Sequence, residues 1–358
     1  MEEPSRHSGA YDNKVKYTLG LKHRTVAQEG SHARLAAPAP EVSYEFEYRN
    51  YACRAFQSLR ERHGIGNEDF AQSVAAGCLS GGQVGEGKSG MLFYFTKDKR
   101  YLLKTVKESE KNFFFHQGIL QAYIEHMEAY PDTLMCRFYG LYKIRMMDPG
   151  EKKKGKKKGK KNRNPWMVII VMANTFETPL ALHERYDLKG STRNRLVKDE
   201  DIKSATSVLK DLNFKSKIYV DSVDAEALRA QLRIDTLWLI KHGIMDYSLL
   251  LGVHKCLPQG DGERALAIAA NSPEAQAAAA RPGVSRWMRD LGGIEGRTPS
   301  GCGEVYLMCV IDTLQVYDMG KKMENMIKRR THDQIAISSV DPKAYGERAH
   351  CSVHVQRL

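Results

Sequence analysis

The sequence predicts an α+β fold whose two lobes share a cleft. With 358 residues, the chain is long enough to bury a substantial core. Its first half holds β-rich runs that meet at the short polar turn Thr96 to Lys99, which is the pattern of an antiparallel hairpin, beside stretches with helical periodicity. Its second half repeats this mixture around a long helical stretch, 227–244. We therefore expect helices packed on antiparallel sheets.

The elements of the first lobe can be placed in order. Residues 44–65 and 67–75 have helical spacing of their apolar residues. Residues 113–131 form an amphipathic helical pattern, which has to end before Pro131 because proline disfavours helical geometry in the residue that precedes it. The expected strands, rich in β-branched and aromatic residues, are 91–106, 138–146 and 166–176.

Composition marks the limits of the folded region. Residues 1–42 mix Gly, Ser and His with an Ala-Pro stretch, and we expect a disordered N-terminal tail there. Residues 43–358 are expected to form one domain, with a first lobe of about 43–175 and a second lobe of about 176–358. Within the second lobe, residues 255–303 are rich in Gly and Ala, which predicts a flexible insert.

The formal net charge of +12 implies an anionic partner. Much of this surplus is local, because residues 151–163 contain nine basic residues and one acidic residue. Charge alone leaves open nucleic acid, a phosphorylated substrate and a membrane rich in acidic lipid. Nucleic acid is not expected, because no aromatic residues that could stack on bases are interleaved with these lysines.

No segment of the sequence is expected to span a membrane. The N-terminus lacks the apolar core of a signal peptide, and the longest apolar run, Trp166 to Ala173, is too short to cross a bilayer. The seven cysteines are scattered, without the paired spacing of zinc sites or disulfide frameworks. A soluble or peripheral protein in a reducing cytosol is therefore expected.

A glycine-rich segment, 81–90, is the first candidate for nucleotide binding. Residues Gly82 to Ser89 match the P-loop pattern G-x₄-G-K-S, but a P-loop opens a helix and the residues after this segment are β-forming. The favoured alternative is a flap between antiparallel strands, whose backbone amides lie over ATP phosphates. Such a flap predicts a lysine on the next strand, where Lys104 stands; an exposed edge-strand lysine is the other interpretation. The candidate flap residues are Gly85, Gly87, Lys88, Ser89 and Gly90.

Two aspartates, Asp246 and Asp312, each interrupt an apolar run that is expected to be a buried strand or its end. A buried carboxylate is costly unless it binds a cation or accepts hydrogen bonds. Phosphoryl transfer would use both, one to orient the attacking hydroxyl and one to hold Mg²⁺. A helix cap or a turn aspartate is the alternative for each.

A polar block at 185–195 places cations beside glycine and hydroxyl groups. It contains Asp187, Lys189 and Arg193, a composition suited to contacts with phosphate. Taken alone, the block is equally typical of a polar surface turn.

Together these segments resemble the phosphatidylinositol phosphate kinase family, from about Tyr44 to Arg348. The stretches that carry the resemblance are Gly87 to Gly90, Leu103 to Val106, Phe138 to Tyr142, Arg185 to Ser191, Met245 to Leu250 and Ile311 to Gln315. The resemblance implies a two-lobed, kinase-like fold with a flat basic surface that faces a membrane, and it implies ATP and Mg²⁺ as cofactors.

By this resemblance, the candidate residues take definite roles. Lys104 would bind ATP phosphates, Asp246 would act in catalysis and Asp312 would bind Mg²⁺. Lys189 would contact the transferred phosphate or the substrate, with Asp187 beside it as a further catalytic residue.

The resemblance also places adenine against a hinge that includes Met172 and Asn174. Kinases usually pair the strand lysine with a glutamate on the following helix, whereas residues 111–115 here read Lys-Asn-Phe-Phe-Phe. Glu108 or Glu110 would have to serve instead, in a shifted register.

Residues 317–330 resemble the substrate-specificity loop of the family. Lys321 and Lys322, together with Arg193, would contact the lipid substrate or the membrane. Glu324 follows the lysine pair, and a glutamate there is characteristic of family members that take phosphatidylinositol 4-phosphate, whereas alanine is found in those that take the 5-phosphate.

The sequence therefore predicts an enzyme that phosphorylates phosphatidylinositol 4-phosphate on its 5-hydroxyl to give phosphatidylinositol 4,5-bisphosphate. The expected setting is cytoplasmic and peripheral, on the anionic inner face of the plasma membrane. Two alternatives stay open: a phosphatidylinositol 5-phosphate 4-kinase, and a weakly active or inactive phosphoinositide-binding scaffold. A homodimer is also left open.

Overall fold

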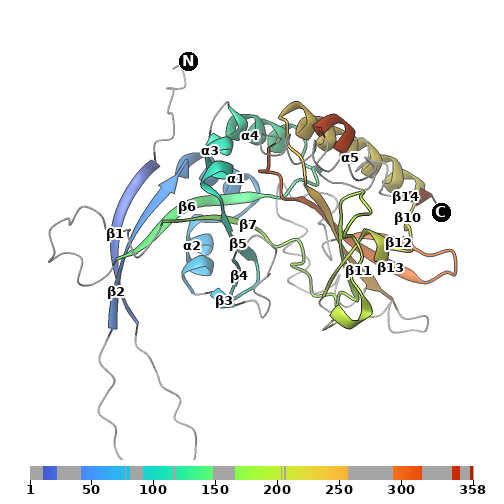
Figure 1. Ribbon diagram of the computed structural model, residues 1–358, viewed down its shortest axis with the longest axis horizontal. Coiled ribbons are helices and arrows are strands. Elements are labelled where there is room, and N and C mark those ends of the chain that lie inside the picture. The colour runs from blue at the N-terminus through green and yellow to red at the C-terminus, as the bar shows by residue number, and fades with distance from the viewer. Residues whose placement is uncertain are drawn as a thin grey trace, which may run out of the picture.

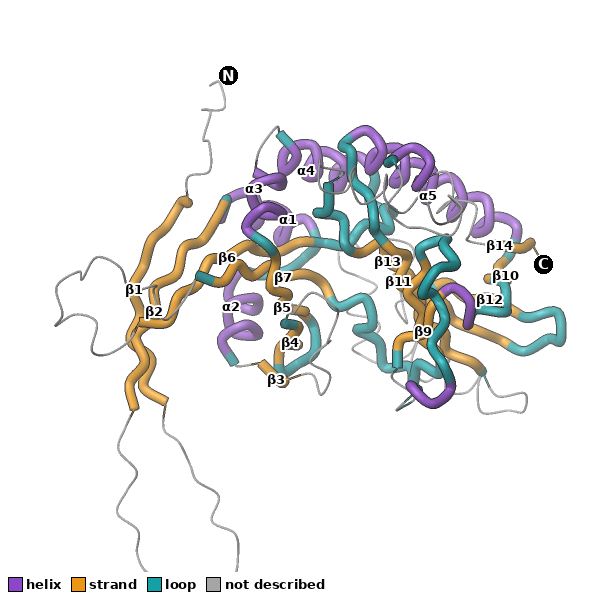
Figure 2. The backbone as a smooth tube through the Cα atoms, in the orientation of Figure 1, coloured by secondary structure: helices purple, strands orange, loops and turns teal. Residues whose placement is uncertain are grey.

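The computed structural model describes residues 11–21, 42–76, 78–80, 92–115, 118–147, 166–202, 204, 207–256, 293–316, 341–346 and 355–357. These residues form two seven-stranded sheets, with most of the helices along one side of them (Figure 1). The tube in Figure 2 follows the same path and shows β1 and β2 extending away from the rest of the molecule. Among the described residues, none of the helices has both the length and the apolar character needed to cross a bilayer.

The first sheet has the order β1-β2-β6-β7-β5-β4-β3, and every neighbouring pair in it is antiparallel. Its strands are β1 (Tyr11–Leu21), β2 (Val42–Tyr51), β3 (Cys78–Ser80), β4 (Phe93–Thr96), β5 (Tyr101–Val106), β6 (Phe138–Met147) and β7 (Met167–Ala173). The expected hairpin is confirmed: at the turn between β4 and β5, the Lys99 N–H donates to the Thr96 carbonyl at 2.8 Å, and Lys99 has a φ of 61°.

Two expectations for the first lobe are wrong. Residues Tyr11–Leu21 lie in the stretch expected to be disordered, yet they form β1 and pair with β2. Residues 44–51 were expected to belong to a helix that continues to residue 65, but they lie in β2, and the helix begins only at Cys53. Strand pairing overrides the helical spacing, because β2 lies between β1 and β6.

In the part of the first lobe that the structure describes there are four helices: α1 (Cys53–Arg62), α2 (Asn67–Ala75), α3 (Glu108–Phe115) and α4 (Ile119–Ala129). The single helix expected over 113–131 is divided, because Gly118 precedes α4 in a left-handed conformation with a φ of 74°. Helix α4 ends at Ala129, before Pro131, as expected.

The second sheet has the order β14-β10-β12-β13-β11-β8-β9. Its strands are β8 (Glu184–Leu188), β9 (Val208–Lys210), β10 (Ile218–Val220), β11 (Ser248–Lys255), β12 (Ile294–Arg297), β13 (Gly303–Ile311) and β14 (Val355–Arg357). It is mixed, since β8 pairs with β9 and β10 pairs with β14 in parallel. Because β12 lies inside 255–303, that segment is not one uninterrupted flexible insert.

The long helix α5 (Ser222–Lys241) lies between β10 and β11 in the chain. The described residues also form the short 3-10 turns η2 (Asp199–Asp201), between β8 and β9, and η3 (Asp211–Asn213), between β9 and β10. Asp221 caps the start of α5, because its side chain accepts a hydrogen bond from the Asp224 N–H at 2.9 Å. The α5 side chains Ala225, Leu228 and Leu239 are fully buried, whereas Val223 and Leu237 are exposed.

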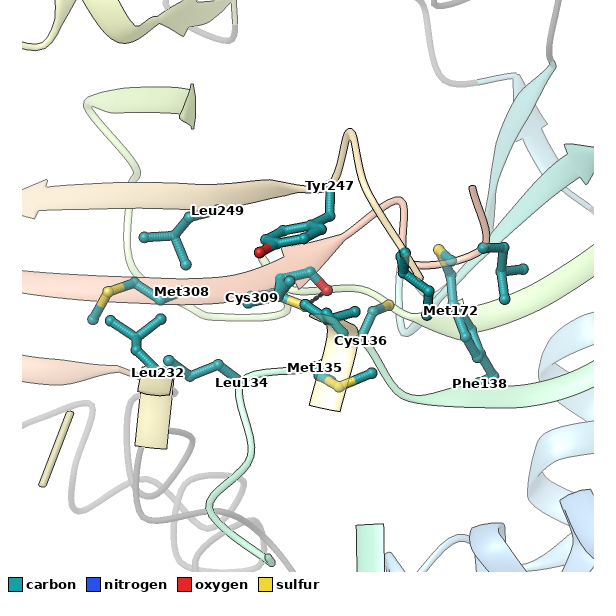
Figure 3. Packing of buried hydrophobic residues seen from close by; sticks show 14 of the residues in the cluster. Leu134, Met135, Cys136, Phe138, Met172, Leu232, Tyr247, Leu249, Met308 and Cys309 are labelled. Atoms are coloured by element: carbon teal, nitrogen blue, oxygen red, sulfur yellow. Dashed lines mark hydrogen bonds between the residues drawn. The ribbon is translucent and has the colours of Figure 1, made fainter. Parts of the chain in front are cut away.

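The two sheets are joined by the segment between α4 and β6. The Cys136 N–H donates to the Val310 carbonyl of β13 at 3.0 Å, and the Val310 N–H donates to the Leu134 carbonyl at 2.6 Å. Figure 3 shows Leu134, Met135 and Cys136 beside Met308 and Cys309. One buried apolar cluster therefore contains residues of both sheets.

A buried carboxylate fixes this joining segment to α5. Asp235 is 1% exposed, and it accepts a hydrogen bond from the Leu134 N–H at 2.8 Å. Its other oxygen lies 2.7 Å from His126 Nε2, 2.7 Å from the Thr133 hydroxyl and 2.8 Å from Gln231 Nε2. The Thr133 hydroxyl, the Gln231 amide and the Leu134 N–H donate to this carboxylate, and His126 Nε2 lies within hydrogen-bond distance of it, so the buried oxygens have partners.

Candidate active site

Asp246 and Asp312 lie at the same edge of the second sheet. Ser248, at the start of β11, pairs with Ile311, at the end of β13. The segment before β11 and the segment after β13 also lie side by side, because the Met245 N–H donates to the Gln315 carbonyl at 3.0 Å. Asp246 lies two residues before β11 and Asp312 directly follows β13, so the expectation that each aspartate lies at the end of a buried strand is confirmed.

Both aspartates have an unusual backbone conformation. Each has a φ of 64°, in the left-handed region that residues other than glycine rarely adopt. Aspartate is among the few residues that tolerate this region. Left-handed residues with side chains cluster at functional sites, so the two matching angles support a functional role for this edge.

Lys104 reaches this edge from the first sheet. It lies on β5, and its ammonium forms an ion pair with the Asp312 carboxylate. Only 11% of the Lys104 side chain is exposed, against 36% for Asp312. The contact joins residues 208 positions apart and brings the expected phosphate-binding lysine to the expected metal ligand.

Lys189 meets the other aspartate. Its ammonium donates to the Asp246 carboxylate at 3.1 Å and to the Asp246 main-chain carbonyl at 2.7 Å. Both side chains are largely buried, with 17% and 15% exposed. Two carboxylates and two ammonium groups thus lie at one edge, a balance suited to binding a ligand that carries both phosphates and a metal ion.

The turn that carries Lys189 is held by Asp211, at the start of η3. One Asp211 oxygen accepts hydrogen bonds from the Lys189 N–H at 2.9 Å and the Gly190 N–H at 2.7 Å. The other accepts from Arg195 Nε at 2.5 Å. Burial alone would lower the pKa of Arg195, but the carboxylates of Asp187 and Asp211 raise it.

Asp187 therefore has a structural partner. Arg195 donates to its carboxylate at 2.8 Å and also to its main-chain carbonyl. Arg193, in the same polar block, is exposed. Neither Asp211 nor Arg195 was singled out from the sequence, because an aspartate in LKDLNF and an arginine in a basic run carry no local signal.

The five flap residues, Gly85, Gly87, Lys88, Ser89 and Gly90, lie outside the described residues. The flanking chain is described, and Cys78 to Ser80 in β3 pairs antiparallel with β4. A P-loop would instead be followed by a helix. The P-loop alternative is therefore wrong, and the segment connects two antiparallel strands as expected for a flap.

The two hinge candidates lie at the end of β7. Met172 is 6% exposed and belongs to the apolar core. Asn174 donates through its side-chain amide to the Lys99 carbonyl at 2.7 Å, which fixes the hinge to the β4–β5 turn. Contacts of these residues with adenine stay a prediction.

Among the described residues, neither Glu108 nor Glu110 pairs with Lys104. The Glu108 carboxylate pairs with Lys111 at 2.5 Å and with Lys143 at 2.8 Å, and Glu110 accepts from the Lys107 N–H at 2.7 Å. Burial raises the pKa of Glu108, but hydrogen bonds from the two lysines lower it below its usual value. Lys104 is oriented by Asp312 instead.

The residues at this edge suit Mg²⁺. Magnesium prefers oxygen ligands and is usually held by one or two carboxylates together with substrate phosphates. Asp312 and Asp246 supply such carboxylates. Among the described residues, no group of three or more His, Cys, Asp or Glu side chains could hold a metal alone, so phosphates would have to complete the coordination.

Comparison with known proteins identifies the family. The family model described as "Phosphatidylinositol-4-phosphate 5-Kinase" matches residues 81–352. The chain belongs to this family. The match covers the flap segment, all four charged residues of the edge and the loop at 317–330.

Individual members of the phosphatidylinositol-4-phosphate 5-kinase family are distant relatives. The chain is 28% identical to "Phosphatidylinositol 4-phosphate 5-kinase 3" of Arabidopsis thaliana over 93% of its length and 50% of the relative's. It is 30% identical to "Phosphatidylinositol 4-phosphate 5-kinase 4" of the same plant, over 86% and 42%. It is 28% identical to "Phosphatidylinositol 4-phosphate 5-kinase 1" of Oryza sativa subsp. japonica, over 86% and 46%. The chain thus spans about half the length of these curated relatives or less.

Proposed function

We propose that the chain phosphorylates phosphatidylinositol 4-phosphate on its 5-hydroxyl, using ATP, to give phosphatidylinositol 4,5-bisphosphate. The observation that carries this is the pair of lysine–aspartate contacts, Lys104 with Asp312 and Lys189 with Asp246, at one edge of the second sheet. Family membership and the names of the relatives support a phosphoinositide as the substrate. Glu324, in the loop at 317–330, supports the 4-phosphate.

Each charged residue has a task in this reaction. Lys104 binds the phosphates of ATP, and its contact with Asp312 shows that it reaches the edge where they would lie. Asp246 accepts a hydrogen bond from the attacking 5-hydroxyl and orients its oxygen. Lys189, which donates to Asp246, places a positive charge beside the transferred phosphoryl group and stabilises the developing negative charge.

Asp312, together with phosphates of ATP, would hold Mg²⁺, which would supply neutralisation of the phosphate charge when bound. Asp312 also keeps Lys104 in place before the nucleotide binds. The one carboxylate therefore serves both the metal and the lysine, and this explains how the site is oriented without a helix glutamate.

The test of substrate and regiochemistry is incubation with Mg·ATP and each of the three monophosphorylated phosphoinositides separately. We expect turnover with phosphatidylinositol 4-phosphate at least about 10-fold above the other two, which corresponds to about 1.4 kcal/mol of discrimination. Chromatography of the deacylated product identifies the isomer. A preference for the 5-phosphate would replace the proposal with a 4-kinase.

A phosphoinositide-binding scaffold is the second candidate. It is favoured by the one departure from the kinase pattern, namely that Glu108 and Glu110 are engaged elsewhere. The same incubation separates the two candidates, because a scaffold binds vesicles containing phosphatidylinositol 4-phosphate but transfers no phosphate from ATP to them.

The proposed setting is the anionic inner face of the plasma membrane, reached from the cytoplasm. Lys321 and Lys322 lie outside the described residues, in the loop at 317–330 that carries a surplus of basic side chains. The double substitution Lys321→Glu and Lys322→Glu is expected to weaken binding to anionic vesicles at least about 10-fold, since each basic residue near such a surface contributes about 1 kcal/mol. Vesicle co-sedimentation measures this, and unchanged binding would remove the loop from the membrane contact.

A further inference from the structure

Asp211 and Arg195 hold the turn that carries Lys189, and we call these two residues with their contacts the clamp. We propose that Asp211, held in place by Arg195, is a positioning residue that acts through Lys189 on Asp246. This inference rests on the proposed function, because Lys189 is a catalytic residue only if the phosphoryl transfer takes place here.

The first step is how Asp211 holds the backbone of the turn. A single oxygen, Oδ1, accepts from two consecutive amides, those of Lys189 at 2.9 Å and Gly190 at 2.7 Å. Gly190 has a φ of 66°, and successive N–H groups at such a position form a concave nest that favours an anion. Asp211 supplies that anion from within the chain and so fixes the point from which the Lys189 side chain starts.

The second step is how Asp211 is itself held. Its other oxygen pairs with Arg195 Nε at 2.5 Å, and the same guanidinium donates to Asp187 of β8. Only 10% of the Arg195 side chain and 13% of the Asp211 side chain are exposed. The planar guanidinium thus connects the carboxylate rigidly to the strand that precedes Lys189.

Parallel pairing reinforces this connection. Asp187 of β8 lies opposite Lys210 of β9, the residue directly before Asp211. The Leu212 N–H also donates to the Arg195 carbonyl at 2.9 Å. Backbone and side-chain contacts therefore hold the two sides of the clamp in one register.

The third step leads to the reacting groups. Lys189 has a long flexible side chain, and its ammonium has to reach both the carboxylate and the carbonyl of Asp246. A displacement of about 1 Å at a catalytic group can cost about 100-fold in rate. Loosening the start of this side chain therefore affects the rate of transfer more than it affects ATP binding, which Lys104 provides.

The experiment is a double-mutant cycle in the full chain. Asp211→Asn keeps the size of the side chain and one acceptor oxygen but removes the charge that pairs with Arg195. We expect it to lower kcat about 10-fold, with the KM for ATP changed less than about twofold, and to have little further effect when Lys189→Ala is already present. A loss of equal size in both backgrounds would mean that Asp211 acts as general structural support, and it would overturn the proposal.

Asp221→Asn is the matched control. Asp221 also accepts a backbone N–H, but it caps the start of α5, at the opposite end of a helix about 30 Å long from the segment that leads to Asp246. Its kcat is expected to equal that of the unsubstituted chain. Arg195→Lys, which keeps the charge but loses the planar fork, is expected to lower kcat in the same direction as Asp211→Asn.

Hydrogen exchange provides a readout independent of activity. The Lys189 and Gly190 amides are expected to exchange at least about 10-fold faster in Asp211→Asn, whereas those of β11 and β13 keep their protection. Unchanged exchange at both amides would overturn the proposal that Asp211 holds this turn, whatever the kinetics show. Faster exchange in a chain that phosphorylates no phosphoinositide would overturn the proposed function and leave the clamp standing.

Discussion

Replacing Asp312 by asparagine is expected to lower lipid phosphorylation about 10³-fold or more while the chain stays folded. The neutral amide removes the charge that would hold Mg²⁺, and Lys104 loses the carboxylate that orients it. The backbone should be preserved, because asparagine tolerates the left-handed φ of 64° as well as aspartate does. The measurement is transfer of labelled phosphate to vesicles containing phosphatidylinositol 4-phosphate.

The control for this variant is Asp199→Asn, an aspartate of η2 that is exposed and lies outside the charged edge. Its activity is expected to match that of the unsubstituted chain. Circular dichroism should show the same thermal transition for both variants. Turnover of Asp312→Asn close to that of the control would contradict the assignment of Asp312 and the proposed role of this edge.

The second large effect is expected on stability. Asp235→Ala removes the acceptor shared by His126, Thr133, Gln231 and the Leu134 N–H, and all four groups would be left without this partner in a region where Asp235 is 1% exposed. Breaking such a buried network is expected to lower the free energy of unfolding by about 3–5 kcal/mol. That is a large part of the roughly 5–15 kcal/mol that stabilises a typical domain.

Urea unfolding followed by tryptophan fluorescence measures this loss, since the Trp238 ring lies 5.5 Å from the His126 ring. Asp235→Asn serves as the graded comparison. Its amide keeps one acceptor oxygen but places donors opposite other donors, so an intermediate loss is expected. Equal stability of Asp235→Ala and the unsubstituted chain would show that the network contributes little.

Local patterns predicted several parts of the fold correctly. The turn at Thr96 to Lys99, the end of the helix before Pro131 and the strands at β6 and β7 all follow from turn residues and periodicity. The exceptions depend on contacts distant in sequence. Residues 44–51 were expected to be part of a helix, but they lie in β2 because β1 and β6 pair with this strand on either side.

The same distinction applies to the candidate site. Asp246 and Asp312 could be found because an acid inside an apolar run is a local anomaly with an energetic cost. Their partners could not be found in this way. That Lys104 pairs with Asp312 rather than with a helix glutamate depends on how the two sheets meet, and the role of Asp211 depends on the parallel pairing of β8 with β9.

The hydrogen bonds between Leu134, Cys136 and Val310 bear on how the two lobes can move. Val310 lies two positions before Asp312, so separating the lobes at this point would break main-chain hydrogen bonds next to the metal ligand. A closing motion of the lobes over a nucleotide would then pivot about this junction. Displacements would grow with distance from it, and would be largest at the far strands β1 and β2, while the charged edge itself moved least.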